Sequence, residues 1–219
     1  STVLLARAPL MPQRATAGDA ATTAPPAADG DRPAFWRFVS WNAAIAAALT
    51  MSMVYTKPWI RSLGLSDRDY AWYDGWVRTP ALVAAVLASV WMLRRWRTRP
   101  LVLVMTLLTA TATALLLAAG LGWRDPLLAA AFAFDSAAKG MSGVVVIGYL
   151  LEVSPGRDPR YPAIYFACGG AGAMLAGGVQ LIGARLLPEA QAPGALLGLG
   201  LLLALIALPL LRARRSEST

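Results

Sequence analysis

The sequence consists mainly of six long apolar segments separated by short polar gaps. A helix of about 20 mostly apolar residues is long enough to cross the hydrocarbon core of a bilayer, and each segment meets or slightly exceeds that length. The segments are Phe35–Tyr55, Tyr70–Leu93, Leu101–Leu121, Pro126–Leu151, Tyr161–Leu187 and Pro193–Leu211. We therefore predict an all-α integral membrane protein with six transmembrane helices.

The composition supports this class and argues against a nucleic-acid partner. Hydrophobic residues make up 57% of the chain, against about 45–50% in soluble domains. The net charge of +8 would favour nucleic-acid binding in a soluble protein. Here the basic residues lie at the ends of the apolar segments, where lipid headgroups favour them. We expect the lipid bilayer as a partner and no nucleic acid.

No residue pattern points to enzyme chemistry. The chain has no histidine, which removes histidine metal ligands and histidine general bases. It also lacks aspartates clustered with metal-ligand spacing and a serine in a nucleophile elbow. We therefore expect no catalytic residues, no metal site and no cofactor.

The gaps between the apolar segments contain many and few basic residues in alternation. Thirteen of the 20 lie before or at the start of the first segment or after the second, fourth and sixth, whereas five lie in or beside the other gaps. Cytoplasmic loops of membrane proteins carry an excess of Lys and Arg. We therefore predict a multi-pass protein of the inner (plasma) membrane with both termini in the cytoplasm.

The composition also divides the chain into three regions. Residues 1–33 are rich in Ala, Thr, Pro and Asp, and we expect a disordered cytoplasmic linker there. Residues 34–215 would form the six-helix transmembrane domain, and residues 216–219 a cytoplasmic tail. Because a linker precedes the first helix, we expect the chain to be the back part of a longer protein.

Two loops resemble those of major facilitator superfamily transporters. Residues 90–100 read VWMLRRWRTRP, which is similar to an arginine-rich loop of that superfamily at Arg95, Arg99 and Pro100. The acidic position of that loop is Arg94 here, and its two glycines are absent. Residues 149–165 read YLLEVSPGRDPRYPAIY, which resembles the loop joining the tenth and eleventh helices of such transporters.

This resemblance implies the C-terminal six-helix half of a twelve-helix transporter. The six helices would then be arranged as two inverted three-helix repeats. The partner would be the N-terminal six-helix half of the same transporter, which supplies the other wall of the path for a small-molecule solute. The implied function is transmembrane transport of that solute by alternating access.

Four ionisable residues interrupt the apolar segments. Asp74 and Arg78 lie in the second segment, and Asp135 and Lys139 in the fourth; the i, i+4 spacing places each pair on one helix face. A charge near the bilayer centre costs at least about 2.5–3.5 kcal/mol unless it is paired. Asp135 and Lys139 either line a substrate or proton pathway or form a structural ion pair. For Asp74 and Arg78 we favour an intramembrane ion pair over an outer gate.

The first segment adds three candidates for the substrate or proton pathway. Asn42 is the costliest polar side chain of that segment to leave unpaired in lipid. Trp41 and Tyr55 are candidate substrate contacts, although aromatic residues near segment ends also serve as interface anchors. By the resemblance, this helix faces the central cavity.

A cluster of charges at the cytoplasmic end is a candidate inner gate. Glu152 has the basic residues of two loops as possible partners, namely Arg94, Arg95, Arg157 and Arg160. A local ion pair that only fixes the loop is the alternative, and we favour it because exposed pairs are common and weak.

Small residues recur every four positions in the fifth segment. Gly169, Ala173 and Gly177 form a small-xxx-small face that permits close helix packing. We expect this face to pack against another helix.

Transport of a small solute is thus the leading hypothesis, and a non-transporting membrane scaffold or sensor with a transporter-like fold is the alternative. Convergence of Asn42, Asp135 and Lys139 on one open groove would favour transport. Burial of the same residues in dry pairs would favour a scaffold.

Overall fold

The structure, a computed structural model, describes residues 32–122, 124–154, 160–189 and 191–211. All regular elements within these ranges are helices. In chain order they are α1 (Arg32–Ser62), α2 (Asp67–Trp72), η2 (Tyr73–Arg78), α3 (Thr79–Leu93), α4 (Thr98–Ala118), η3 (Ala119–Leu121), α5 (Arg124–Val153), α6 (Arg160–Leu186) and α7 (Ala192–Leu210).

The described residues form six helical spans that are long and apolar enough to cross a membrane. This confirms the all-α class and the predicted number and order of the segments. The helix α1 begins at Arg32, so the last two positions of the predicted linker are helical. Pro33 fits the first turn, where a missing N–H costs no helical hydrogen bond. The predicted tail and the rest of the linker lie outside the described residues.

The second span is built from α2, η2 and α3 in succession. Its start is a capping box: Ser66 Oγ accepts the backbone N–H of Asp69, and the Asp69 carboxylate accepts the backbone N–H of Ser66 at 2.8 Å. The middle piece, η2, is a π-helix that ends directly before Thr79 and Pro80. A proline leaves a carbonyl of the preceding turn without its helical partner. This irregular stretch carries two of the four intramembrane charges.

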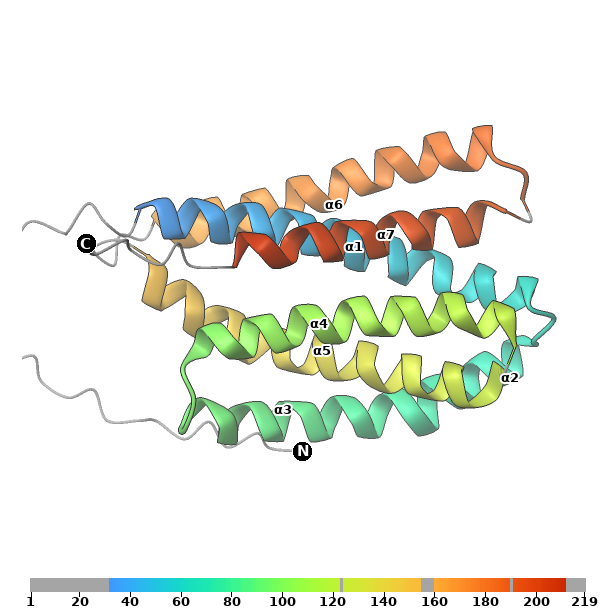
Figure 1. Cartoon of the computed structure of the whole chain (residues 1–219), viewed down its shortest axis with the longest axis horizontal. Coiled ribbons are helices and arrows are strands. Elements are labelled where there is room, and N and C mark those ends of the chain that lie inside the picture. The colour runs from blue at the N-terminus through green and yellow to red at the C-terminus, as the bar shows by residue number, and fades with distance from the viewer. Residues whose placement is uncertain (1–31, 123, 155–159, 190, 212–219) are drawn as a thin grey trace, which may run out of the picture.

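The helices pack in two groups that meet along one seam. In the first group α1 packs against α6 and α7, and in the second α5 packs against α3 and α4. Contacts between α4 and α7 join the groups. Figure 1 shows the helices running roughly along the long axis of the molecule. Helices that are neighbours in the chain are therefore not always neighbours in the bundle.

Two glycines allow the closest helix approaches. A Cβ at Gly172 of α6 would lie 2.3 Å from the carbonyl oxygen of Ala43 on α1. A Cβ at Gly140 of α5 would lie 2.8 Å from the carbonyl oxygen of Leu82 on α3. Each group thus contains one contact where only a glycine fits, as expected for helices that pack closely in a membrane.

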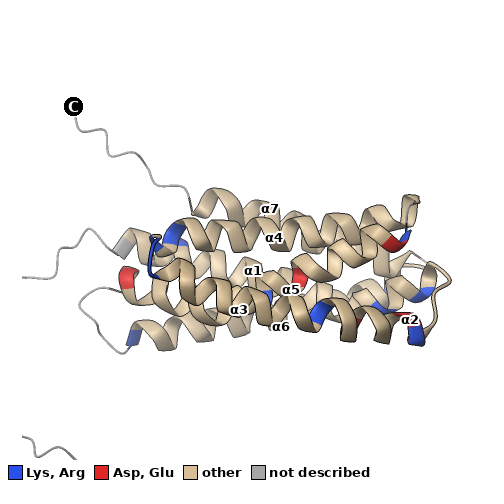
Figure 2. Cartoon of the chain, turned by 90° about the horizontal axis from the view of Figure 1, so that it is seen from below, with Lys and Arg blue, Asp and Glu red and all other residues tan. Residues whose placement is uncertain are grey.

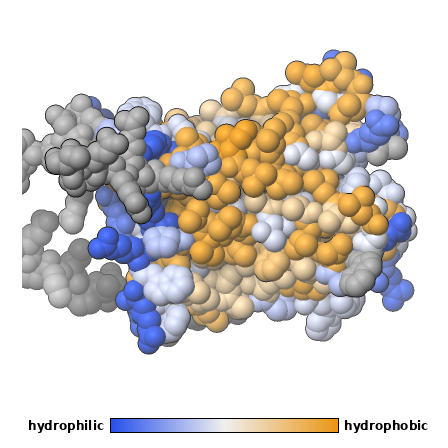
Figure 3. Space-filling model, in the orientation of Figure 1, coloured by the Kyte–Doolittle hydropathy of each residue, from blue (hydrophilic) through white to orange (hydrophobic). Residues whose placement is uncertain are grey.

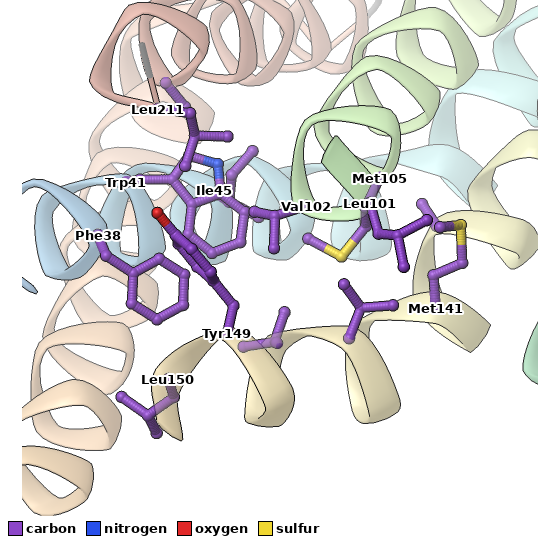
Figure 4. Packing of buried hydrophobic residues seen from close by; sticks show 14 of the residues in the cluster. Phe38, Trp41, Ile45, Leu101, Val102, Met105, Met141, Tyr149, Leu150 and Leu211 are labelled. Atoms are coloured by element: carbon purple, nitrogen blue, oxygen red, sulfur yellow. The ribbon is translucent and has the colours of Figure 1, made fainter. Parts of the chain in front are cut away.

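An aromatic cluster ties three helices together near one end of the bundle. The Phe38 ring stacks on Trp41 and on Tyr165, with 5.1 Å between ring centroids in both pairs. The Tyr149 ring meets Phe38 edge-on at 4.8 Å. Figure 4 shows Phe38, Trp41 and Tyr149 converging from α1 and α5. These contacts fix α1, α5 and α6 relative to one another.

Charged residues lie mostly at the two ends of the bundle, with an apolar belt between them (Figures 2 and 3). The start of α1, the α3–α4 connection, the end of α5 and the end of α7 lie at the same end (Figure 1). The arginine-rich gaps of the sequence are the gaps beside these four points. Of the arginines in these gaps that the structure describes, Arg37, Arg94, Arg95, Arg97, Arg99 and Arg160 lie at or beside these points and so share one end, as the alternating gaps predict.

Candidate functional site

The four intramembrane charges form one cluster between the second and fourth spans. Arg78 pairs with Asp74 of its own span and, through Nη2, with Asp135 Oδ2 on α5 at 3.2 Å. The Lys139 Nζ donates to the same Asp135 oxygen at 2.7 Å. The two i, i+4 pairs of the sequence are thus joined into a network of two acids and two bases. Asp135 and Lys139 lie in the middle part of α5, whereas the other charged residues of α5 lie near its two ends.

The cluster is most buried at Asp135 of α5 and most exposed at Asp74 of η2. The Asp135 side chain is 11% exposed, whereas the Asp74 side chain is 45% exposed. The Arg78 guanidinium lies over the Phe132 ring at 4.8 Å, a favourable cation–π distance. Asp135 is therefore the most buried charge of the network, and Arg78 links it to the more accessible Asp74.

A small polar pocket adjoins the network. It is lined by polar side chains of α1, Ser52 and Thr56, together with Arg78, Asp135 and apolar side chains of α4 and α5. Its volume is about 10 Å³, close to the least that holds one water molecule. The buried Arg78 Nε has no hydrogen-bond acceptor among the described residues. A buried donor of this kind calls for a water molecule or a ligand atom.

Asn42 and Trp41 lie elsewhere and make interhelical hydrogen bonds. The Asn42 Nδ2 donates to the backbone carbonyl of Tyr165 on α6 at 2.8 Å. The Trp41 Nε1 donates to Thr106 Oγ1 on α4 at 3.0 Å, and Trp41 is 1% exposed. Neither residue lines the pocket beside Asp135. Asn42, Asp135 and Lys139 therefore do not converge on one groove.

Tyr55 connects α1 to α6 in a similar way. Its hydroxyl donates to the backbone carbonyl of Gln180 at 3.4 Å, and the Gln180 amide donates to the carbonyl of Thr50 at 3.3 Å. Both residues are buried. These bonds satisfy polar groups inside an apolar bundle and join the two helices.

The candidate inner gate has a different partner from those expected. Glu152 accepts a hydrogen bond from the Thr98 hydroxyl at the start of α4. Arg94 and Arg95 are exposed, and the Arg95 guanidinium lies over the Trp91 ring at 4.5 Å. Arg160 is exposed at the start of α6, and Arg157 lies outside the described residues.

Arg99 makes an interhelical contact that the sequence reasoning did not assign. Its Nε donates to the backbone carbonyl of Leu211 at 3.0 Å, and its Nη2 donates to the same oxygen. The contact satisfies a carbonyl at the end of α7. Arg99 stands 112 positions from Leu211, so sequence patterns gave no signal for this pairing.

The small residues of α6 differ in what they touch. A Cβ at Gly169 would lie 2.7 Å from Asn42 Nδ2, so Gly169 does pack against α1. Ala173 is partly exposed, and a Cβ at Gly177 would meet nothing within 4 Å. The buried positions of α6 are instead Tyr165, Gly172, Ala176 and Gln180. The face of α6 that packs on α1 therefore differs from the predicted face. The small-residue pattern did not distinguish the two, because α6 has small residues on more than one side.

Comparisons with protein-family models, with curated proteins and with solved structures found no match to this chain. The function is therefore argued from the fold and from the charge network.

Proposed function

We propose that this chain is the C-terminal half of an alternating-access secondary transporter for a small solute, in the manner of the major facilitator superfamily. The observation that carries the proposal is the Arg78–Asp135 ion pair, which links the second and fourth spans midway along an apolar bundle. Ionisable groups at that depth are costly and mark substrate or ion pathways. The adjoining pocket and the buried Arg78 Nε give the network a place to meet a ligand or a proton.

The packing pattern supports two inverted three-helix repeats. In this arrangement α1 corresponds to α5, α3 to α6, and α4 to α7. The contacts of α1 with α6 and α7 then correspond to the contacts of α5 with α3 and α4. The α4–α7 seam corresponds to itself. The two tight glycine contacts also correspond to each other: Gly172 packs α6 against α1, and Gly140 packs α5 against α3. One repeat comprises α1 to α4, and the other α5 to α7.

Burial within the bundle supports a partner half. In the apolar windows of α4 and α5, 50% of residues are buried, against 11% for the second span and 17% for α6. These two spans occupy equivalent positions in the proposed repeats. They face the N-terminal six-helix half, which closes the solute path on the side where Asp74 is exposed.

In this proposal Arg78 is the switching group. It pairs with Asp74 and Asp135 together in the present state. Binding of a solute carboxylate to Arg78 competes with Asp135 for the guanidinium, weakens the link between η2 and α5 and lets the two repeats move apart.

Two observations favour a second function, that of a membrane scaffold or sensor. Asn42, Asp135 and Lys139 do not converge on one open groove, since Asn42 bonds the Tyr165 carbonyl on α6 instead. The four charges also neutralise one another, and the volume of about 10 Å³ beside them is enough for about one water molecule. Such a network also serves simply to hold two helices together. A scaffold needs the network for stability but not for solute movement.

Uptake assays separate these functions. Cells that express the whole gene are tested with labelled sugars, amino acids, organic anions and organic cations, and the responding class is then measured for Lys139→Gln. Transport predicts a loss of at least about tenfold in initial rate at unchanged protein level. The matched control is Lys57→Gln, the other lysine of the chain, which lies exposed near the end of α1.

Equal rates for Lys139→Gln and the wild type would remove Lys139 from the mechanism. Absence of uptake for every solute class, with the protein present in the membrane, would favour the scaffold.

A further inference from the structure

A second pocket lies at the arginine-rich end of the bundle, apart from the charge network. Its volume is about 220 Å³, and helices α1, α4, α5 and α7 surround it. Its lining combines two arginines, one tyrosine and apolar side chains. These residues are Ala34, Arg37, Phe38, Arg99, Tyr149, Leu210 and Leu211.

We propose that this pocket binds the phosphate of an anionic phospholipid headgroup. Arg37 comes from α1 and Arg99 from α4, so two cations from different helices meet at one cavity. Tyr149 of α5 lines the same cavity. Two guanidinium groups and a hydroxyl are the donors that phosphate oxygens accept most readily.

The backbone contacts of the arginines hold them at the pocket. Arg99 uses its Nε and Nη2 on the Leu211 carbonyl, and a guanidinium has five N–H donors. The Arg37 Nε donates to the Pro33 carbonyl at 3.2 Å. A backbone carbonyl thus holds each side chain beside the cavity, so a ligand orders it at a small further entropy cost.

The surroundings select a lipid rather than an isolated ion. Phe38, Leu210 and Leu211 give the cavity apolar walls, and Figure 4 shows Phe38 and Leu211 near Tyr149. An apolar wall beside a basic group suits the junction between a headgroup and its acyl chains. The nearby acid, Glu152, is engaged by the Thr98 hydroxyl. The assignment rests on the membrane placement proposed above but not on transport.

Native mass spectrometry of the purified chain tests the site. The detergent-solubilised protein is titrated with short-chain phosphatidylglycerol, with phosphatidylcholine of the same chain length, and with glycerol 3-phosphate. Phosphatidylglycerol is expected to bind at least about tenfold more tightly than phosphatidylcholine. Arg37→Gln is expected to lower the affinity for phosphatidylglycerol about tenfold. Tyr149→Phe removes a single hydroxyl and is expected to weaken binding about threefold.

The matched control is Arg97→Gln, an exposed arginine at the same end that does not line the pocket. An equal loss for Arg97→Gln and Arg37→Gln would overturn the site, because it would mean attraction to the basic surface as a whole. Equal binding of the two lipids would also overturn it. Arg37-dependent binding of glycerol 3-phosphate as tight as that of the lipid would support the phosphate site and identify a soluble phosphate as its ligand. Uptake by the same variants is measured separately, so a failed lipid site is distinguishable from failed transport.

Discussion

Arg78 on η2 and Asp135 on α5 form an ion pair at 3.2 Å although 57 positions separate them in the chain. The pair is the main polar link between the second and fourth spans. Asp135 is mostly buried and Arg78 partly so. Removing one member of the pair leaves the other with a single partner, Asp74 for Arg78 or Lys139 for Asp135, and unbalances the charge of the network. Stability and function of the bundle are therefore both expected to depend on it.

Asp135→Asn is expected to lower the free energy of unfolding by about 1–3 kcal/mol. The substitution preserves shape and leaves Arg78 and Lys139 facing a neutral amide. Thermal unfolding of the detergent-solubilised chain measures the effect. The control is Asp67→Asn, whose ion pairs with Lys57 and Arg61 are exposed and worth at most about 1 kcal/mol. Equal losses in both variants would contradict the special role of Asp135.

Gly172→Ala is expected to destabilise the chain by about 1–3 kcal/mol through steric overlap. Its Cβ would meet the carbonyl oxygen of Ala43, so α6 must move away from α1. The same substitution at Gly178, where a Cβ meets nothing within 4 Å, is expected to be neutral or stabilising because alanine favours the helix. The two melting temperatures, measured side by side, check this prediction. A Gly178→Ala variant as unstable as Gly172→Ala would refute it.

Thr106→Val is expected to cost about 1–3 kcal/mol, because it leaves the buried Trp41 N–H without its acceptor. Thr113→Val on the same helix is the matched control. The Thr113 hydroxyl donates only within α4, to the carbonyl of Thr109, so its loss is expected to be below about 1 kcal/mol. Unfolding monitored by tryptophan fluorescence reports both variants. A smaller loss for Thr106→Val than for Thr113→Val would count against the Trp41 bond.

The orientation in the membrane can be tested with thiol labelling. Cys168 is the single cysteine of the chain, so Cys168→Ala gives a background for Arg68→Cys and Arg97→Cys, both at exposed positions. If the arginine-rich end is cytoplasmic, an impermeant maleimide labels the first variant in intact cells and the second only after permeabilisation. The reverse pattern would invert the proposed topology.

The helical spans could be predicted because their signals are local. Apolar length alone predicts each span, and the alternation of arginine-rich gaps predicts which connections share an end. The capping box of Ser66 and Asp69 at the start of the second span is equally local, since it involves only neighbouring residues. The helices begin a few residues before the predicted apolar segments at Arg32 and Asp67, where charged residues open the first turns.

The partners of the polar side chains could not be predicted in this way. Asn42 and Trp41 were candidates for a solute path, yet each is paired with another helix. Asp135 and Lys139 form the ion pair that their spacing allowed as one of two alternatives, but the additional link to Arg78 depends on how α5 lies beside the second span. Spacing along one helix reveals only the i, i+4 pair.

The sequence by itself thus determined the number and order of the helices and which connections share an end, because hydrophobic length and charge at the helix ends act locally. Only the tertiary structure decided which faces meet. In a membrane helix nearly every face is apolar, so periodicity does not distinguish a packing face from a lipid-exposed one. The contact of α6 through Gly172 rather than Ala173, and the meeting of Arg78 with Asp135, both follow from the rotation of packed helices about their axes.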